Sequence, residues 1–234
     1  MTHTVRLAAL TLACALGAAN AAAQRPAVLP DTMEQRVLAC TSCHAPKPNR
    51  ENAFFPRIAG KPSDYLYNQL INFREGRRQY PLMTYMVQHL SDDYLREIAV
   101  HFSQQHIAPP PPQRADSSPA VFERGSVLAT KGDAALKVPA CIACHGEKLT
   151  GVAPAIPGLL GLPRDYVNAQ LGAWRNKTRR AHAPDCMADI AVRMSAADID
   201  AVSRWLAVQQ MPADTRPAAA AARPLPLACG SSPD

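Results

Sequence analysis

The sequence predicts an all-α protein with two tandem modules of the same fold, joined by a proline-rich linker. The chain has 234 residues, of which 47% are hydrophobic and 19% charged, and this composition is too apolar for a disordered protein. Apolar residues recur at helical spacing in both halves, whereas no alternating strand pattern stands out. A set of residues that includes two cysteines and a histidine occurs twice, and four consecutive prolines separate the two occurrences. Such internal repetition indicates two copies of one module rather than one large domain.

Residues 1–23 have the features of an export signal. Arg6 supplies a positive charge, residues 7–17 form an apolar run, and the alanines at 21–23 provide a small-residue cleavage site. The run is too short to cross a bilayer, so we expect a mature chain without a transmembrane segment, in an oxidising compartment such as the bacterial periplasm. Peripheral association with a membrane is compatible with this expectation. Cys14 raises the alternative of lipid attachment, although the residues before it fit such a site poorly.

The repeat is clearest at Cys40-Thr41-Ser42-Cys43-His44, which recurs as Cys141-Ile142-Ala143-Cys144-His145 at an offset of 141 − 40 = 101. The same offset aligns further pairs: Pro56 with Pro157, Gly60 with Gly161, Tyr65 with Tyr166, Gln69 with Gln170, Arg74 with Arg175, and Arg78 with Arg179. After a three-residue insertion the offset becomes 187 − 83 = 104, which aligns Met83 with Met187. We therefore assign residues 24–106 to an N-terminal module and residues 120–211 to a C-terminal module.

Two segments lie outside the repeat. Residues 107–119 contain the run Pro109–Pro112, which favours extended polyproline II and acts as a semi-rigid spacer. Residues 212–234 form a tail rich in Ala and Pro. We expect this tail to lack a core of its own.

Within each module the helix signals fall at matching places. Ser63 is a candidate N-cap for one helix, and Ser91 is a candidate N-cap for the last helix of the N-terminal module. In the C-terminal module, Ser195 and Asp198 have the spacing of a capping box. The apolar stripes of the two last helices are Leu95, Ile98, Ala99 and Phe102, and Ile199, Val202 and Leu206.

Cys-x-x-Cys-His is the attachment signature of c-type haem. Two thiols on one turn can form thioethers with the two haem vinyl groups, and the histidine that follows can bind the iron. We therefore predict two covalently bound haem c groups, held through Cys40 and Cys43 and through Cys141 and Cys144, with His44 and His145 as iron ligands. The alternatives are zinc and thiol redox chemistry. Zinc motifs place their cysteine pairs closer together, and thioredoxin-like motifs need a βαβ setting.

The sixth iron position in each module is assigned to methionine. Met83 and Met187 align between the copies, and a thioether sulfur raises the reduction potential of haem iron. The plain alternative is that these methionines fill the core, as most do. Met86 and Met194 lie near the same place, and His89 and His182 are rival ligands, but none of these four has a counterpart of its own type in the other copy.

The sequence resembles the cytochrome c4 family of diheme c-type cytochromes. The resemblance runs from about Met33 to Gln210, and its motifs are Phe55-Pro56-Arg57-Ile58-Ala59-Gly60, Asn72-Phe73-Arg74-Glu75-Gly76-Arg77-Arg78 and Leu90-Ser91-Asp92-Asp93. It implies two tandem class I cytochrome c domains with His–Met iron, haems that lie close together, and electron delivery to terminal oxidases. It also implies that the carbonyls of Pro56 and Pro157 orient the two histidines. The C-terminal module departs from the family motifs at Leu159-Leu160-Gly161 and at Trp174-Arg175-Asn176-Lys177, without touching an iron ligand.

Basic residues cluster after the same helix in both modules. Arg74, Arg77 and Arg78 mirror Arg175, Lys177, Arg179 and Arg180. They either stabilise a helix C-terminus or pair with haem propionates or with an acidic patch of a partner. Removal of the signal leaves 25 − 1 = 24 basic residues against 19 acidic ones. This mild excess is spread along the chain, so we expect no nucleic-acid partner.

Cys186 and Cys229 are left over after the haem motifs. In an oxidising compartment they are expected to form a disulfide, which would hold the tail beside Met187 and could shield that haem edge. The alternative is two free thiols.

Three functions are compatible with two haems. The first is a periplasmic electron carrier, not an enzyme, which donates to a haem–copper terminal oxidase and is reduced by a quinol–cytochrome c reductase or a dehydrogenase. The second is the cytochrome subunit of a periplasmic dehydrogenase complex. The third is a diheme redox enzyme, such as a peroxidase or a thiosulfate-oxidising enzyme, which would need an unusual ligand such as a Cys186 thiolate. Two His–Met irons have no open position, and this favours electron transfer.

Overall fold

The computed structural model describes residues 29–44, 54–106 and 108–232. The expected export signal, Cys14, the start of the N-terminal module and residue 107 of the linker lie outside the described residues. By compactness the chain divides into Met1–Arg36 and Val37–Asp234. The module boundaries proposed from the repeat stay predictions.

The first unit contains one described helix, α2 (Met33–Arg36). The guanidinium of Arg36, the last residue of this helix, pairs with the carboxylate of Asp31 ahead of the helix at 2.6 Å. Both side chains are exposed, so this pair adds little stability.

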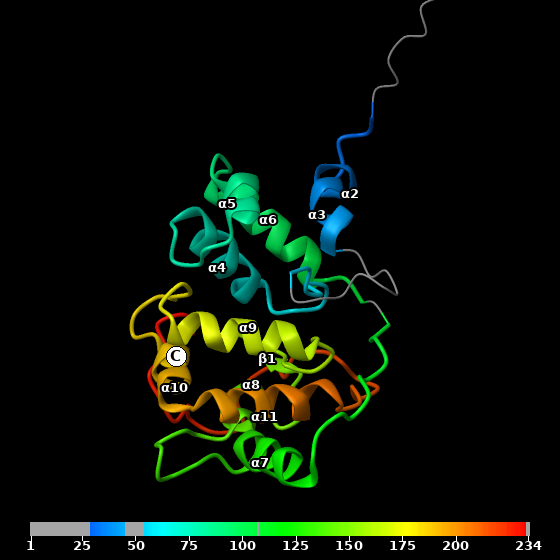
Figure 1. Ribbon diagram of the computed structural model, residues 1–234. Helices are drawn as coiled ribbons and strands as arrows, with labels where there is room; N and C mark the ends of the chain where they lie inside the picture. Colours follow the sequence, from blue (N-terminus) through cyan, green and yellow to red (C-terminus); the bar gives the residue numbers. More distant parts are fainter. Residues whose placement is uncertain (1–28, 45–53, 107, 233–234) are drawn as a thin grey trace, which may run out of the picture. The chain divides into compact units, whose positions relative to one another are not determined.

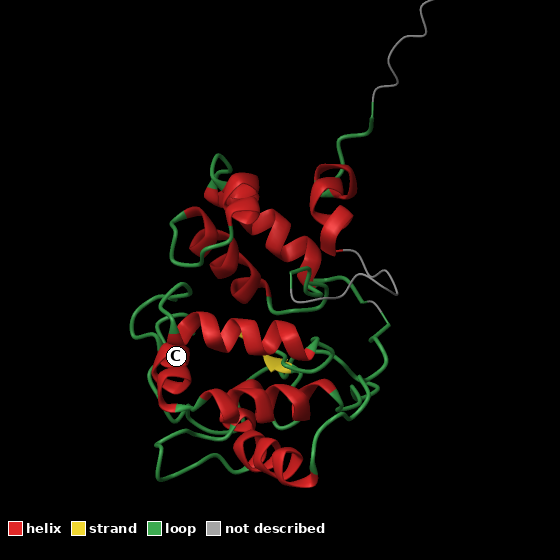
Figure 2. Ribbon diagram, viewed as in Figure 1, coloured by secondary structure: helices red, strands yellow, loops and turns green. Residues whose placement is uncertain are grey.

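Helices dominate the second unit, which confirms the prediction of an all-α fold (Figures 1 and 2). The first copy of the repeat contributes α3 (Leu38–His44), α4 (Ser63–Arg74), α5 (Pro81–Val87) and α6 (Asp92–Ser103). The second copy contributes α7 (Pro119–Thr130), α8 (Cys141–His145), β1 (Gly151–Val152), β2 (Ile156–Pro157), α9 (Arg164–Arg175), α10 (Cys186–Arg193) and α11 (Ala196–Ala207). The strands pair antiparallel, with Gly151 opposite Pro157. They are too short to give a periodic pattern, and the sequence did not predict them.

The caps explain where the helices begin. Ser91 accepts a hydrogen bond from the backbone N–H of Tyr94, and Ser195 and Asp198 form a reciprocal capping box, so both predictions are confirmed. The prediction for Ser63 is wrong by one residue. Ser63 is the first residue of α4, and Pro62 occupies the N-cap position, where its fixed φ suits the start of a helix.

Each copy has its own apolar core. In the first copy, buried side chains of α4 meet those of α6. In the second copy, α7 packs on α11 and α9 packs on both α10 and α11, around a larger cluster. Gly125 lets α7 approach α11 closely, since a Cβ atom there would collide with the Ala201 carbonyl and with Cβ of Trp205.

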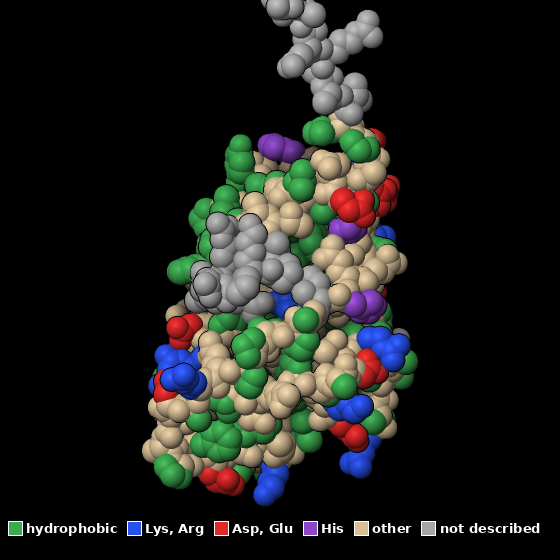
Figure 3. Space-filling view, turned by 90° about the vertical axis from the view of Figure 1, so that its right-hand side faces the viewer, with side chains coloured by type: hydrophobic (Ala, Val, Ile, Leu, Met, Phe, Trp, Pro, Cys, Tyr) green, Lys and Arg blue, Asp and Glu red, His purple; other side chains and the backbone are tan. Residues whose placement is uncertain are grey.

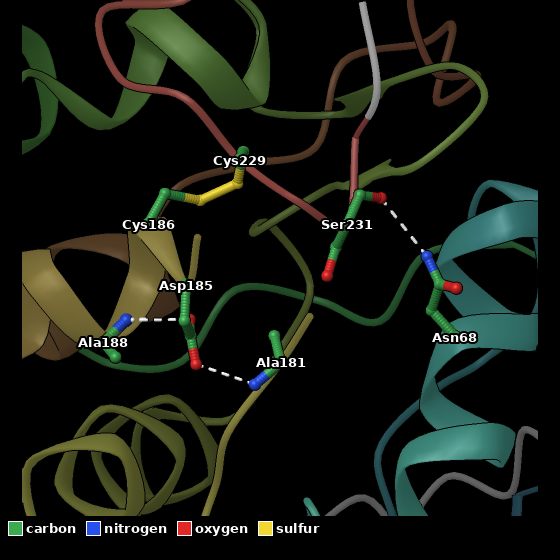
Figure 4. Close-up of a disulfide and its surroundings, with 7 residues drawn as sticks. All are labelled: Asn68, Ala181, Asp185, Cys186, Ala188, Cys229 and Ser231. Atoms are coloured by element: carbon green, nitrogen blue, oxygen red, sulfur yellow. Dashed lines mark hydrogen bonds between the residues drawn. A yellow bond between two sulfur atoms is a disulfide. The ribbon is translucent and has the colours of Figure 1, made fainter. Parts of the chain in front are cut away.

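The tail folds back on the second copy. We call its described part, residues 212–232, the strap. Its Ala218 exchanges backbone hydrogen bonds with Gly151 and Ala153 beside β1. Cys229 is joined to Cys186 with a Cα–Cα distance of 5.1 Å, which confirms the predicted disulfide. Figure 4 shows this disulfide and the Ser231 carbonyl, which accepts a hydrogen bond from Asn68 of α4 at 3.2 Å.

No helix among the described residues combines the length and the apolar character that crossing a membrane requires.

Candidate functional site

The predicted haem residues of the first copy gather around one apolar pocket. Cys40 and His44 come from α3, and Met83 comes from α5. The cavity they line has a volume of about 330 Å³. Aromatic and aliphatic side chains of α4 and α6 contribute to its lining: Leu66, Leu70, Phe73, Ile98, Ala99 and Phe102. Residues of the second copy, among them Tyr166, Gln170 and Arg179, line it as well. Cys43 lies on α3 but is not among the residues that line this cavity.

The second copy builds a corresponding pocket. Cys141, Cys144 and His145 come from α8, and Met187 comes from α10. This cavity is smaller, about 180 Å³. Each pocket is therefore lined by one of the predicted histidines and one of the predicted methionines. His44 and Met83 are 83 − 44 = 39 residues apart in sequence, and His145 and Met187 are 187 − 145 = 42 residues apart.

Both histidines are oriented by a proline carbonyl. Nδ1 of His44 lies 2.8 Å from the Pro56 oxygen, and Nδ1 of His145 lies 2.7 Å from the Pro157 oxygen. The contacts expected from the family resemblance are therefore confirmed. Because Nδ1–H donates to the carbonyl, Nε2 is left as the ring nitrogen for a metal. Burial lowers the pKa of both imidazoles, which keeps them neutral and able to ligate.

The thiols lie in apolar surroundings. Burial raises the pKa of Cys40 and Cys144, and it raises the pKa of Cys141 to about 12. These thiols therefore stay protonated, and they do not resemble the exposed, acidic thiols of redox motifs. Among the described residues, no three His, Cys, Asp or Glu side chains gather as a metal-ion site.

The rival ligands differ in position. Met86 is absent from the lining of the first pocket, and His89 is exposed. Met194 lines the second pocket but belongs to its buried core, as expected. His182 also lines the second pocket, and its Nε2 contacts the Arg77 guanidinium at 3.2 Å. His182 therefore lies beside the second pocket, where its ring contacts an arginine of the first copy, and the first copy has no histidine at the corresponding position.

Cys186 has no thiolate to offer. It is held in the disulfide with Cys229, so the hypothesis that a Cys186 thiolate replaces the methionine sulfur does not fit the structure.

Polar groups around the second pocket fit a buried anionic cofactor. Nε1 of Trp174 and Oγ of Ser231 are buried, and neither has a hydrogen-bond partner within the described part of the chain. Both residues line the pocket. Buried donors left without acceptors are costly, and the carboxylates of a haem c could satisfy them.

Two arginines join the copies in a symmetric arrangement. Arg78 and Arg179 face each other in an antiparallel bridge. The Arg78 guanidinium donates to Gln69, Tyr166 and Gln170, and Arg179 donates to Gln170 and Gln69 in return, at distances of 2.7–3.0 Å. Tyr65 is a further partner of Arg179. The arrangement therefore repeats itself about a pseudo-two-fold axis.

These arginines carry an uncompensated charge. Arg179 is 5% exposed, and burial, together with the charge of Arg78, lowers its pKa to about 10. Within the described residues neither guanidinium is paired with a carboxylate. Buried charge of this kind calls for an anionic partner, and Arg179 and Gln170 line both pockets. Haem propionates would supply the negative charge, which favours that hypothesis over a helix-terminal role.

The neutral partners of these arginines were not predicted from the sequence. Tyr65, Gln69, Tyr166 and Gln170 had no assigned role, although each aligns with its counterpart in the repeat. That alignment was the available signal. It could not reveal that Gln69 bonds across to the other copy, because the partner lies 110 residues away.

Charges of both signs are mixed on the surface. On the face in Figure 3, Lys and Arg side chains lie beside Asp and Glu side chains. Examples of such pairing are Arg204 with Asp116 at 2.6 Å and Arg164 with Asp165 at 3.0 Å.

Comparisons with known proteins agree with this geometry. No family model matches the chain. The chain is 35% identical over 174 residues to the thiosulfate dehydrogenase electron acceptor of Thiomonas intermedia, covering 74% of this chain and 79% of that protein. It is 31% identical to cytochrome c4 of Pseudomonas aeruginosa, covering 74% of this chain and 85% of that protein.

Two solved structures share the fold. Reduced cytochrome c4 from Pseudomonas stutzeri superposes with a TM-score of 0.64 at 28% identity, covering 76% of this chain and 96% of that chain. The thiosulfate dehydrogenase of Marichromatium purpuratum superposes with a TM-score of 0.65 at 28% identity, covering 74% of this chain but only 36% of that longer chain.

Proposed function

The chain belongs to the cytochrome c4 family of diheme c-type cytochromes, and from this premise we propose that it accepts electrons from a thiosulfate-oxidising dehydrogenase and passes them on to a terminal oxidase. It is an electron-transfer protein, not an enzyme, and it carries two covalently bound haem c groups. Each haem supplies a one-electron oxidation and reduction of its iron.

The proposed haem attachment follows the two pockets. Cys40 and Cys43 bind one haem covalently, and Cys141 and Cys144 bind the other. His44 and Met83 ligate the first iron, and His145 and Met187 ligate the second. The observation that supports this assignment is that each copy brings a carbonyl-oriented histidine and a methionine to one apolar cavity.

The residues of the chain prepare these sites for fast electron transfer. Two fixed protein ligands leave no position for substrate, and an apolar lining excludes water from the iron. The Arg78–Arg179 pair would hold the propionates of both haems near the junction of the copies, which would keep the two cofactors in fixed positions.

The choice of electron donor rests on the relatives. Two similar proteins, from Thiomonas intermedia and Stutzerimonas stutzeri, bear the name thiosulfate dehydrogenase electron acceptor. Delivery to a haem–copper oxidase follows from the cytochrome c4 resemblance alone. Both steps would take place in the periplasm, where the predicted export signal would send the chain.

The ligand assignment is tested by potentiometry. Met83→His and Met187→His should each lower the reduction potential of one haem and abolish its methionine-to-iron charge-transfer band, because imidazole lacks the thioether's preference for ferrous iron. Met86→Leu on α5 is the matched control and should leave both potentials unchanged. If neither histidine variant shifts a potential, the methionine assignment is wrong.

The electron donor is tested by stopped-flow spectroscopy. The oxidised diheme protein, mixed with a thiosulfate dehydrogenase and thiosulfate, should be reduced at both haems much faster than with thiosulfate alone. Equal rates with and without the enzyme would contradict the proposed donor. A reduced protein that a haem–copper oxidase cannot oxidise would contradict the proposed acceptor.

A further inference from the structure

Corresponding positions beside the two proposed methionine ligands have opposite environments. The residue before Met83 is Leu82, which is 48% exposed, and Tyr85 on the same short helix is 71% exposed. The residue before Met187 is Cys186, which is bonded to Cys229 of the strap. The first methionine therefore lies on a helix open to solvent, whereas the second lies on a helix fastened to another segment.

Further contacts fasten the strap directly after Cys229. Gly230 donates its backbone N–H to the Pro184 carbonyl at 2.9 Å. A side chain at Gly230 would collide with the backbone of His182 and Ala183, so the strap lies against the loop that leads into α10. Beyond it, the Ser231 carbonyl accepts the hydrogen bond from Asn68 of the first copy at 3.2 Å (Figure 4).

The strap is part of the wall of the second haem pocket. Five of its residues line that cavity together with the proposed iron ligands: Leu225, Leu227, Cys229, Ser231 and Ser232. Oγ of Ser231 is buried there without a partner among the described residues. The described lining of the first pocket includes no strap residue, and that cavity is the larger one.

We propose that the strap, latched by the Cys186–Cys229 disulfide, closes the C-terminal haem to outside reactants, so that electrons enter and leave the protein through the N-terminal haem. The inference rests on the proposed ligands Met83 and Met187. A reactant reaches the closed haem only while the strap is open. The rate of electron transfer with this haem is therefore proportional to the fraction of molecules in which the strap is open. The disulfide keeps that fraction small because it prevents the strap from leaving α10.

The test uses the full-length diheme protein in a Met83→His background. That change lowers the potential of the N-terminal haem, so the single electron of the half-reduced protein resides on the C-terminal haem. Ferricyanide then takes that electron and becomes ferrocyanide. Adding Cys186→Ala and Cys229→Ala should raise the oxidation rate at least about tenfold, since the loss of the cross-link raises the open fraction.

A matched control places the same two alanines in a Met187→His background, where the electron resides on the N-terminal haem. There the oxidation rate should not change. A second variant, Leu225→Ala/Leu227→Ala, thins the wall while the disulfide stays intact, and it should also raise the rate in the Met83→His background. It serves as the test if the cysteine variant does not fold.

The outcomes separate the strap from the ligand assignment. In one outcome, Met83→His lowers the potential, but neither the cysteine variant nor the leucine variant raises the rate of oxidation by ferricyanide. The strap proposal is then overturned and the proposed function stands. An equal increase in both backgrounds also overturns it. If Met83→His shifts no potential, the ligand assignment and this inference fail together.

Discussion

The C-terminal copy builds most of its haem pocket from protein. There α7 lies against α11 at Gly125, a continuous buried cluster surrounds the cavity, and the strap closes one wall. In the N-terminal copy, the residues before Cys40 are divided between two units, with α2 in the first and α3 in the second. Its described core is formed mainly by α4 and α6, and its methionine helix carries exposed apolar side chains.

This contrast shows which parts of a duplicated module are free to diverge. The haem motif, the oriented histidine and the methionine are kept in both copies. The packing that supports them is not. We infer that the C-terminal copy depends less on its cofactor for folding, because its described residues bury more apolar protein side chains than those of the N-terminal copy.

The largest effect is expected when one haem is removed at a time. Cys40→Ala/Cys43→Ala and Cys141→Ala/Cys144→Ala should each leave a single haem per chain, measured as the ratio of haem to protein. Loss of the N-terminal haem should melt α4, α5 and α6, since little else fills their cavity. Loss of the C-terminal haem should leave more of its helices intact.

Circular dichroism and hydrogen exchange distinguish the two variants. Slow amide exchange should persist in α9 and α11 of the Cys141→Ala/Cys144→Ala protein. Equal loss of helix in both variants would show that the cores do not differ in the way described.

A smaller effect is expected at the helix crossing of the C-terminal copy. Gly125→Ala introduces a Cβ where the Ala201 carbonyl and Trp205 leave no room, so it should lower the free energy of unfolding by about 1–3 kcal/mol. Gly172→Ala on α9 is the matched control, because a Cβ there meets nothing within 4 Å. The control should stabilise its helix by about 0.5–1 kcal/mol. Unfolding in guanidinium chloride measures the free energy of unfolding of both variants. If Gly125→Ala and Gly172→Ala destabilise the protein equally, the proposed role of Gly125 is wrong.

The smallest effect concerns the last helix and its pH dependence. Burial alone would raise the pKa of Asp198, but its hydrogen bonds with Arg124 and Ser195 outweigh burial and lower it. A carboxyl whose folded pKa is lowered stabilises the protein above its ordinary pKa, and this contribution is lost as the pH falls through the folded value. Asp198→Asn should therefore cost about 2 kcal/mol at neutral pH.

The difference in stability between the two proteins should begin to shrink below about pH 4 and should disappear only below the lowered pKa of folded Asp198. The N-terminal copy has Tyr94 at the position of Asp198 and only the Ser91 cap. Asp93→Asn in α6 is accordingly the control, and it should change stability little at any pH. A constant difference between wild type and Asp198→Asn from neutral to acid pH would contradict the assignment.

Much of this molecule follows from short-range patterns. Cys-x-x-Cys-His places two thiols and an imidazole on one turn, so the cofactor chemistry needs no knowledge of the fold. Ser91 and Ser195 begin their helices because a cap bonds to a residue three positions on. Ser63 is not the N-cap of α4, because Pro62, directly before it, is an equally good residue for the start of a helix.

The sequence by itself determined the repeat, the all-α class and the haem motifs, and it favoured a disulfide between the two remaining cysteines. Only the tertiary structure decided that Arg78 and Arg179 meet, that Gln69 and Gln170 are shared between the copies, and that the strap forms a wall of one pocket. The physical reason is the separation in sequence between the residues that interact. Local patterns follow from backbone geometry over a few residues, whereas an Ala- and Pro-rich tail carries no periodicity that specifies the surface on which it will lie.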